Sequence, residues 1–477
     1  MRLGWFTPLR PVTSGIADYS ADVLPAIAAG HQVDVFVASP AERRATAPPG
    51  VEIRDAHEFP WRVHRGGYDL VVYQLGNAWC HDYMWPYVFA YPGLVVLHDA
   101  HLHHARAWSL LRRRRQEDYR DEFEFNHPAA PPGAAAIALG GYAGSIYYAW
   151  PMLRAVVTSA RGIAVHNATV AAELRRDWPE AEVTEIPLGV TDPLADPPGS
   201  ARPARLDRAA RLAVRAGLAA PLRERYHIAP GALVVAAFGG VTPEKRITAL
   251  LRATAAVRPH RPDLRLLLVG QQAPHYDARA EARALGLDDC TTLTGFVPDE
   301  DLPAHLALAD VASCLRWPTA RETSGAWLRS AAAGLATLIT DLVHQPHLPS
   351  LDPRTWRVVH AEPRLEPPAP VAVSIDVLDE DHSLRLALGR LVCDETLRLS
   401  LGDAARAFWQ GRHTVTHMAA GYARALESAA GRRAPGVTLP GHLRPDPLAH
   451  ARAIVTAAGL DAGLLAGLEP KEGESGG

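Results

Sequence analysis

The stretch from 315 to 334, LRWPTARETSGAWLRSAAAG, combines residue types that a sugar-phosphate site needs. It follows an apolar run, and ETSG at 322–325 opens a helical pattern. A helix start offers unpaired N–H groups and a partial positive charge, so it attracts phosphate, and Gly325 leaves room for a ligand. Glu322 would repel phosphate but accepts hydrogen bonds from sugar hydroxyls. The segment therefore suits a sugar diphosphate, although an ordinary capped helix uses the same residue types.

A second candidate phosphate site follows the apolar run 233–238. Gly239 and Gly240 allow a ligand to approach the backbone closely. The Thr-Pro pair at 242–243 has the residue types of a helix N-cap and first helical position, which places Lys245 in the first turn. A cation there opposes the helix dipole. Lys245 is thus expected either to bind a negatively charged ligand or to lie on a solvent-exposed helix face.

Polar residues also follow three strand candidates of the first half. Ligands of open α/β sheets lie beyond the carboxyl ends of the strands. Ser14 and Gly15 precede a helical pattern after the first apolar run, and either face an anion or form a simple turn. Asn77 and His81 follow the run at 70–73, and we treat both as candidates for contacting an acceptor.

The histidine-rich segment HDAHLHHAR begins at His98, directly after the run at 94–97. A metal site is the first alternative, but adjacent histidines point to different sides, and no cysteine or second acid cluster completes a coordination shell. We therefore predict no metal. The preferred interpretation places His98 and Asp99 inside a cleft, where His98 contacts a reacting sugar and Asp99 lies on the acceptor side.

Apolar runs alternate with helical patterns along the whole chain, which predicts parallel sheets covered on both faces. The pattern starts afresh after 228, so the sequence predicts an α/β protein of two doubly wound domains. The expected divisions are 1–195, a linker and hinge helix at 196–228, 229–404, a helical stretch at 405–430, and a Pro/Gly-rich, partly frayed tail at 431–477. The predicted strands are 3–6, 33–38, 70–73, 94–97, 163–165, 183–186, 233–238, 266–269, 291–293, 311–315 and 335–339.

The composition bounds the function classes. A chain of 477 residues exceeds what one core organises, and a net charge of −3 argues against general nucleic-acid binding. The sequence shows no bilayer-length apolar run and no secretory signal, and its four cysteines are scattered, so we expect a cytoplasmic protein with reduced thiols. The arginine run at 112–115 has acidic residues four positions on, which favours a solvated helix face over a membrane contact.

In order and spacing, these segments resemble the GT-B glycosyltransferases, and most closely glycosyltransferase family 4 (glycosyl transferases group 1), over residues 1–425. The matching elements are TSGIADYS, LHD at 97–99, IPLGV, GGVTPEK, LLLVG, LTGFVPDEDL and PTARETSG…AAAG. The resemblance implies two Rossmann-like domains that face each other across a cleft, with the nucleotide-sugar held by the C-terminal domain. It also implies that the last helix, within 405–430, crosses back to the N-terminal domain.

The resemblance also implies roles for individual residues. His98, Lys245 and Glu322 would be catalytic. The donor-binding residues would be Ser14 and Gly15 near the phosphates, Gly239, Gly240 and Lys245 at the diphosphate, Gly295, Phe296 and Val297 at the nucleobase, and Glu322, Thr323, Ser324 and Gly325 at the sugar. Two departures stand out: Gly240 occupies the place of a usual arginine, and Arg329 and Ser330 occupy the region of a usual ribose-binding glutamate. Arg329 is then expected to lend positive charge to the donor site.

The expected reaction is retaining, metal-independent transfer of a sugar from a nucleoside diphosphate to a hydroxyl of a sugar, a lipid-linked sugar or a small molecule. The nucleotide-sugar is a substrate, and no cofactor is expected. A non-catalytic nucleotide-sugar-binding or scaffold protein and a nucleotide-sugar epimerase are the alternatives. Acceptor contacts are expected from 76–83 and from the irregular stretch 102–148, within which the Gly- and Pro-rich segment 128–145 predicts a mobile loop.

Overall fold

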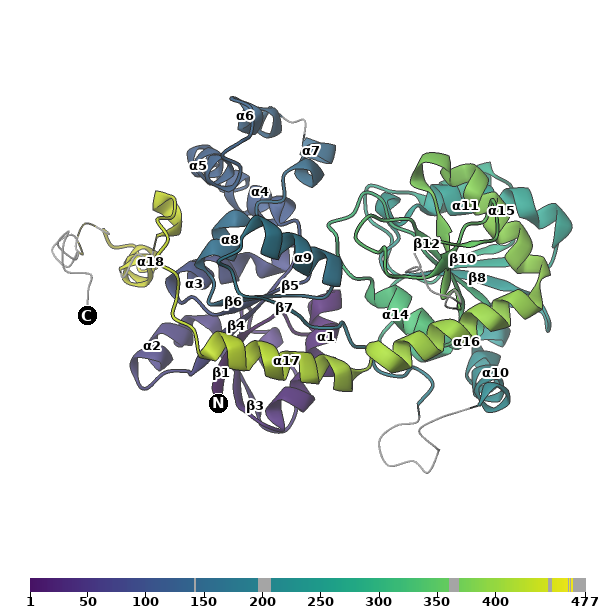
Figure 1. Ribbon diagram of the computed structural model, residues 1–477, viewed down its shortest axis with the longest axis horizontal. Coiled ribbons are helices and arrows are strands. Elements are labelled where there is room, and N and C mark those ends of the chain that lie inside the picture. The colour runs from purple at the N-terminus through teal and green to yellow at the C-terminus, as the bar shows by residue number, and fades with distance from the viewer. Residues whose placement is uncertain are drawn as a thin grey trace.

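The protein consists of two α/β units, each built around one twisted sheet (Figure 1). The computed structural model describes residues 1–140, 143–195, 207–359, 369–444, 448–461, 463 and 465. The prediction of two doubly wound, largely parallel domains is confirmed.

The first domain contains a seven-stranded parallel sheet. Its strand order is β3 (Val51–Asp55), β2 (Gln32–Val37), β1 (Arg2–Phe6), β4 (Leu70–Leu75), β5 (Leu94–Leu97), β6 (Gly162–Val165) and β7 (Val183–Glu185). The helices of the sheet's crossovers include α1 (Gly15–Ala28), α2 (Phe59–His64), α3 (Trp85–Ala90), α8 (Arg154–Ser159) and α9 (Ala168–Asp177). Strand β3 was not predicted from the sequence, because this partly exposed edge strand, VEIRD, lacks a continuous apolar run.

The second domain contains an eight-stranded sheet that is parallel except for the pair β13–β14. Its order is β10 (Thr291–Leu293), β9 (Arg265–Val269), β8 (Val234–Phe238), β11 (Val311–Cys314), β12 (Ala336–Thr340), β15 (Ala372–Ile375), β13 (Ser350–Leu351) and β14 (Val358–Val359). Its helices are α11 (Ile247–Val257), α12 (Ala278–Ala284), α13 (Leu302–Leu308), α14 (Gly325–Ala332) and α15 (Glu380–Cys393). Strands β13 to β15 are short and were not predicted.

The chain passes between the domains at two places. After β7 it leads to α10 (Arg208–Arg225), which packs against α13 of the second domain. Near the end, α16 (Glu395–Arg412) packs against α14, and α17 (Val415–Ala430) packs against α1, so these two helices run along both domains (Figure 1). The helical stretch predicted at 405–430 therefore belongs to two helices, because Thr414 caps α17 by accepting from the His417 N–H.

The two crossings are bonded to each other. The Val190 N–H donates to the His413 carbonyl at 2.9 Å, and the Trp409 indole N–H donates to the Val190 carbonyl at 3.2 Å. A Cβ at Gly189 would lie 2.5 Å from the Thr414 carbonyl oxygen, so only glycine allows this approach. The hinge is one packed junction.

The prediction of a mobile loop within 102–148 is wrong for its described part. The stretch contains α4 (His103–Leu111), α5 (Gln116–Asn126), α6 (Ala134–Leu139) and α7 (Ala143–Ala149), while residues 141–142 lie outside the described residues. The predicted i, i+4 arginine pairs are also wrong. Arg114 has φ 57° between α4 and α5, which interrupts helical spacing. Arg113 instead pairs with Asp82.

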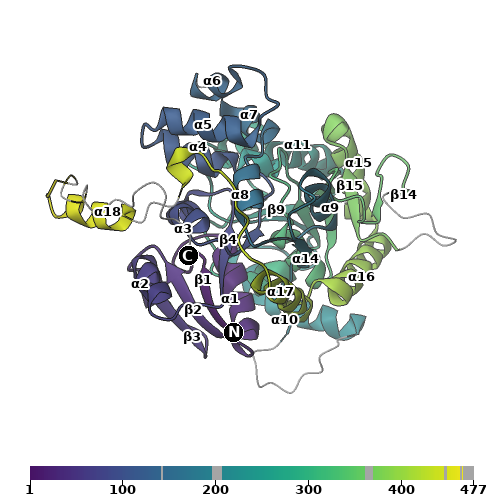
Figure 2. The same cartoon turned by 60° about the vertical axis from the view of Figure 1, so that its left-hand side comes forward.

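The tail predicted as frayed is partly packed. Leu439 and Leu443 are buried against the first domain, and the His442 Nε2 lies 2.9 Å from a Glu122 carboxylate oxygen. Helix α18 (Ala449–Ala457) then stands away from the body of the molecule (Figure 2). Residues 445–447, 462, 464 and 466–477 lie outside the described residues. Within the described chain, no helix has the length and apolarity needed to cross a membrane.

Candidate functional site

The predicted site residues follow the strands at which each sheet reverses its strand order. In the first sheet the order reverses between β1 and β4, and in the second between β8 and β11. Crevices at such points are where open α/β sheets bind ligands. Ser14 and Asn77 follow the first pair of strands, and Gly239 and Glu322 follow the second.

Lys245 lies behind the glycine turn that follows β8. Its ammonium donates to the Phe238 carbonyl at 2.8 Å. Gly239 has φ 91°, a conformation that favours glycine, and a Cβ there would lie 2.9 Å from the Lys245 Nζ, so the ammonium lies close against this turn. The placement of Lys245 in the first turn of an α-helix is wrong. It ends a 3₁₀ turn, Arg246 adopts φ 56°, and α11 begins only at Ile247.

Lys245, Arg316 and Glu322 form one charged cluster. The pKa of Lys245 is lowered to about 8, first by burial and then by the nearby Arg316 charge. Cys314 and Glu322 oppose this change. The Arg316 guanidinium is ion-paired with the Glu322 carboxylate. Arg316 was not among the predicted site residues. It lies just beyond a buried strand, at the same sheet edge as the other candidates, and this position could have identified it.

The helix start predicted from ETSG is present. Ser324 caps α14 by accepting from the Trp327 N–H at 3.1 Å, and Gly325 is the first helical residue. The Thr319 hydroxyl donates to the second Glu322 oxygen at 2.8 Å. Thr323 faces the first domain, where its hydroxyl donates to the His166 carbonyl at 3.0 Å. The carboxylate and the helix-end amides are therefore neighbours.

His98 follows β5 in the first domain and packs against the rings of Tyr19 and His166. Its Nε2 lies 2.8 Å from the Gln74 amide oxygen, and the Gln74 amide NH₂ donates to the Tyr422 hydroxyl of α17. Because an amide oxygen only accepts, Nε2 carries the proton and Nδ1 keeps a lone pair. Burial, reinforced by His166 and His81, holds the pKa of His98 well below its usual value, so the ring is neutral. A neutral Nδ1 can accept a hydrogen bond from a sugar hydroxyl.

Asp99 faces Glu322 across the domain junction. Its carboxylate accepts from the Asn77 backbone N–H at 2.6 Å. Burial and the Glu322 charge raise the pKa of Asp99 to about 7, against the opposing effect of that N–H and of Arg316. One acid from each domain thus shares this site, and Asp99 holds a proton for much of the time at neutral pH.

The structure gives Asn77 and His81 supporting places and does not present them to an acceptor. The Asn77 amide oxygen accepts from the Ala105 N–H of α4 at 3.0 Å, so this side chain holds the start of α4. His81 is fully buried, and a Cβ at Gly76 would lie 2.9 Å from its Nε2. Burial also lowers the pKa of His81 to about 4. Their expected contact with an acceptor does not fit this packing.

The two remaining donor loops lie beside each other. Ser14 caps α1 by accepting from the Ile16 N–H at 3.2 Å, and Gly15 begins that helix. Gly295 has φ 71°, Phe296 is 59% exposed and Val297 packs against the core. Arg10 of the first loop is ion-paired with Asp299, two residues beyond the second.

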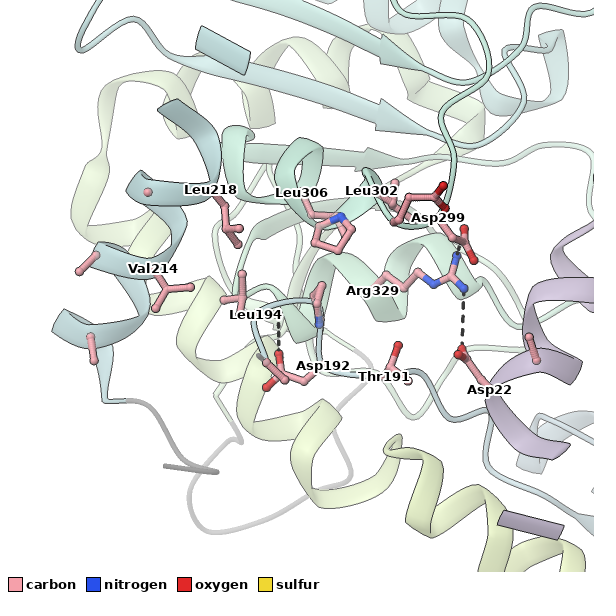
Figure 3. A pocket seen from close by; sticks show the side chains of 18 of the residues that line it. Asp22, Thr191, Asp192, Leu194, Val214, Leu218, Asp299, Leu302, Leu306 and Arg329 are labelled. Atoms are coloured by element: carbon pink, nitrogen blue, oxygen red, sulfur yellow. Dashed lines mark hydrogen bonds and ion pairs between the residues drawn. The ribbon is translucent and has the colours of Figure 1, made fainter. Parts of the chain in front are cut away.

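A cavity of about 1010 Å³ lies beyond these loops, between the two domains and α10 (Figure 3). Arg329 lies in it, 3.8 Å from the Asp22 carboxylate and 3.9 Å from the Asp299 carboxylate. Burial raises the pKa of Asp22 to about 6, and Arg329 opposes that change. The apolar lining includes Leu194, Val214, Leu218, Leu302 and Leu306.

Contacts between the domains close the site at Glu322. The Ala100 N–H donates to the Ala320 carbonyl at 2.9 Å, and Arg321 is ion-paired with Glu173. Beside Glu322 the hollow lined by Arg316, Ser324 and Trp327 has about 20 Å³, enough for one water.

The histidine-rich segment does not gather around one point. His103 is fully buried, and its Nε2 lies 2.7 Å from the Tyr119 hydroxyl. His104 lies near Asn77, with 3.2 Å between Nδ1 and the amide nitrogen. Across the part of the chain that the structure describes, no three His, Cys, Asp or Glu side chains form a group suited to a metal ion.

Comparisons with known proteins agree with this architecture. Residues 232–353 match the family model described as "Glycosyl transferases group 1". No curated protein matches the chain closely enough to count as a relative.

Solved structures that resemble the chain include the following three. Sucrose-phosphate synthase from Thermosynechococcus elongatus shows 16% identity and a TM-score of 0.58, with 89% of this chain and 98% of that chain covered. HepE from Anabaena in complex with UDP-glucose shows 13% identity and a TM-score of 0.60, with 90% and 100% covered. The catalytic domain of Starch Synthase IV from Arabidopsis thaliana, bound to ADP and acarbose, shows 13% identity and a TM-score of 0.62, with 90% and 99% covered. The resemblance to GT-B glycosyltransferases is thereby confirmed, and the fold is GT-B.

Proposed function

We propose that this protein transfers a sugar, with retention of anomeric configuration and without a metal, from a nucleoside diphosphate to an acceptor hydroxyl. The observation that carries the proposal is the charged cluster of Lys245, Arg316 and Glu322 beside the start of α14, with Asp99 of the other domain close to Glu322. Cations and helix-end amides suit a diphosphate, and a carboxylate with a neutral histidine suits sugar hydroxyls. The glycosyltransferase structures that share the fold support the same interpretation.

The charged groups of this site could stabilise the charges that such a reaction creates. The departing diphosphate gains negative charge, which Lys245 and Arg316 would stabilise together with the α14 amides. Arg316 would leave its pair with Glu322 for the phosphate, and Glu322 would then be free to accept from the sugar. The departing phosphate oxygen can take the acceptor proton, so retention needs no separate base in this scheme. Contact between the domains would exclude water that otherwise hydrolyses the donor.

The nucleoside part of the donor fits the cavity of about 1010 Å³. Its walls combine aliphatic side chains for a base with Asp22, Asp299 and Arg329, which can bond ribose hydroxyls. The loop at 295–297, expected at the nucleobase, leads directly to Asp299. Arg329 would serve the donor here, in place of the ribose-binding glutamate.

The binding step is tested by a thermal-shift panel of UDP, GDP and ADP and their sugars, since a bound donor raises the unfolding temperature by mass action. Val214→Trp should fill the cavity from α10 and weaken the shift, whereas Leu212→Trp, on the same helix but outside the cavity lining, should not. A panel without any stabilising nucleotide would refute the proposal.

Turnover is tested with the donor that binds. Release of the nucleoside diphosphate together with a glycosylated product supports transfer, and Glu322→Gln should slow it at least ~10²-fold. Glu395→Gln, an exposed acid at the start of α16 and outside the cavity lining, is the matched control. Donor converted to an epimer without any acceptor would instead identify an epimerase, and binding without turnover a scaffold or sensor.

A further inference from the structure

Three ring side chains of the first domain pack together next to Asn77, whose backbone N–H binds the Asp99 carboxylate. His104, near the start of α4, lies edge-to-face against Tyr148 of α7, with ring centroids 4.9 Å apart and 63° between the ring planes. Tyr147 packs against the same imidazole at 4.7 Å and 71°. All three rings are partly exposed, so the crossed rings of His104 and Tyr148 present both faces and edges to a ligand.

Asn77 connects His104 to the reacting cluster, because its amide nitrogen lies 3.2 Å from the His104 Nδ1 and its backbone N–H donates to the Asp99 carboxylate at 2.6 Å. Burial raises the pKa of Tyr148, and the next contributions come from Glu244 and Arg316, followed by Glu322 and Asp99. These four groups come from both domains and include the acid expected to contact the donor sugar. The pKa of Tyr147, in contrast, is raised by burial alone. Tyr148 is therefore the member of the pair on which the charges of the cluster act.

His104 is held in one orientation with a free donor. Its Nδ1 faces the Asn77 amide nitrogen at 3.2 Å, and the Asn77 amide oxygen is already occupied by the Ala105 N–H. The amide NH₂ therefore donates to Nδ1, which places the imidazole proton on Nε2. Within the described residues, the structure gives the Nε2 no hydrogen-bond partner. This N–H is available to a ligand hydroxyl.

We propose that His104 and Tyr148 form the acceptor subsite, and that the acceptor is the pyranose ring of a glycoside. This inference rests on the proposed function. A sugar ring offers C–H faces to aromatic rings and many hydroxyls to an imidazole N–H, a phenol and nearby carboxylates, which is the mixture found here. A flat aromatic acceptor would leave most of these polar groups without partners. Asn77 was itself predicted to contact the acceptor. In this proposal it instead orients His104, and His104 contacts the acceptor.

The experiment uses the full chain saturated with the nucleoside diphosphate found in the panel above. Saturation-transfer NMR measures binding of methyl α- and β-glycosides of glucose, galactose, mannose and N-acetylglucosamine, and of p-cresol and indole as flat aromatic probes. The variants are His104→Phe and Tyr148→Phe, which keep a ring and remove one polar group. Tyr147→Phe is the matched control on the same helix. Unfolding temperature and nucleotide affinity of every variant are measured in parallel.

The expected result is binding of at least one glycoside to the wild-type complex, weakened about 5- to 10-fold in His104→Phe and in Tyr148→Phe, as expected for loss of one hydrogen bond. Tyr147→Phe and the nucleotide affinities should be unchanged. Glycosides that fail to bind while the nucleotide binds, preference for p-cresol or indole, or equal affinities in all three variants would each overturn the acceptor subsite and leave the proposed function standing. Absence of nucleotide binding would overturn the proposed function itself.

Discussion

Replacing Lys245 with methionine should make the unliganded protein more stable while weakening its binding of a nucleoside diphosphate. The ammonium is held under the Gly239 turn with one backbone hydrogen bond, beside the positive Arg316. A buried charge so placed costs folding free energy, and a phosphate would relieve that cost. The two effects of the substitution therefore have opposite signs.

The magnitude follows from the pKa. The pKa of Lys245 is about 8 in the folded protein, against 10.5 for a free lysine side chain. This difference corresponds to about 3 kcal/mol of destabilisation at pH 7. Because the folded state binds this proton more weakly, wild-type stability rises as the pH passes from 8 toward 10.5. The advantage of Lys245→Met should therefore shrink to about 1 kcal/mol at pH 10. Loss of a charge-assisted bond to phosphate should weaken nucleotide affinity about 10- to 100-fold.

The assay is urea unfolding at pH 7 and pH 10, together with calorimetric titration of the nucleotide. Arg252→Met is the control, since Arg252 is an exposed cation of α11 paired with Asp381 and should change either quantity little. If Lys245→Met is less stable than wild type at pH 7, or binds the nucleotide equally well, the argument from burial and charge is refuted.

Three further predictions use the same site. Asp22→Asn should stabilise the protein, and its gain over wild type in unfolding free energy should grow by about 1 kcal/mol between pH 5 and pH 8; the folded Asp22 pKa of about 6 is raised, so wild type loses stability as that carboxyl ionises. A constant gain across that range would contradict it. Gly240→Arg should tighten nucleotide binding about tenfold in calorimetry, because a Cβ there meets nothing closer than 3.6 Å and restores the cation usual in the resembled family; weaker binding would mean that the diphosphate lies elsewhere. EDTA should leave the transfer rate unchanged, and activity restored only by added divalent ions would refute metal independence.

The sequence predicted the fold well because strands that are covered on both faces leave continuous apolar runs. The runs at 94–97 and 311–315 are buried on both faces and match β5 and β11 closely. Short or half-exposed strands such as β3 and β14 carry no such signal, since their pairing depends on neighbours distant in sequence. The helices at 102–148 were missed for a related reason: the Gly and Pro residues between them outweighed their short periodic segments.

Site chemistry was predictable in type and less so in arrangement. Glu322 and Ser324 occupy the helix start that their order suggested. Arg316 escaped notice because its relation to Lys245 and Glu322 exists only after β8 and β11 have paired. The burial of His81 and the hydrogen bond from the α4 backbone to Asn77 likewise depend on tertiary structure. The local sequence does not distinguish a polar residue that supports the fold from one that contacts substrate.

The junction of Val190 with His413 has a mechanical consequence. Two chain crossings that are bonded to each other would act as one pivot, so a relative movement of the domains would be a swing more than a twist or a slide. Such a swing would separate Arg321 from Glu173 and carry Asp99 away from Glu322, and each return would restore the same pairing. Reproducible alignment of donor and acceptor would then be a property of the pivot, supplied at a distance from every residue that touches substrate.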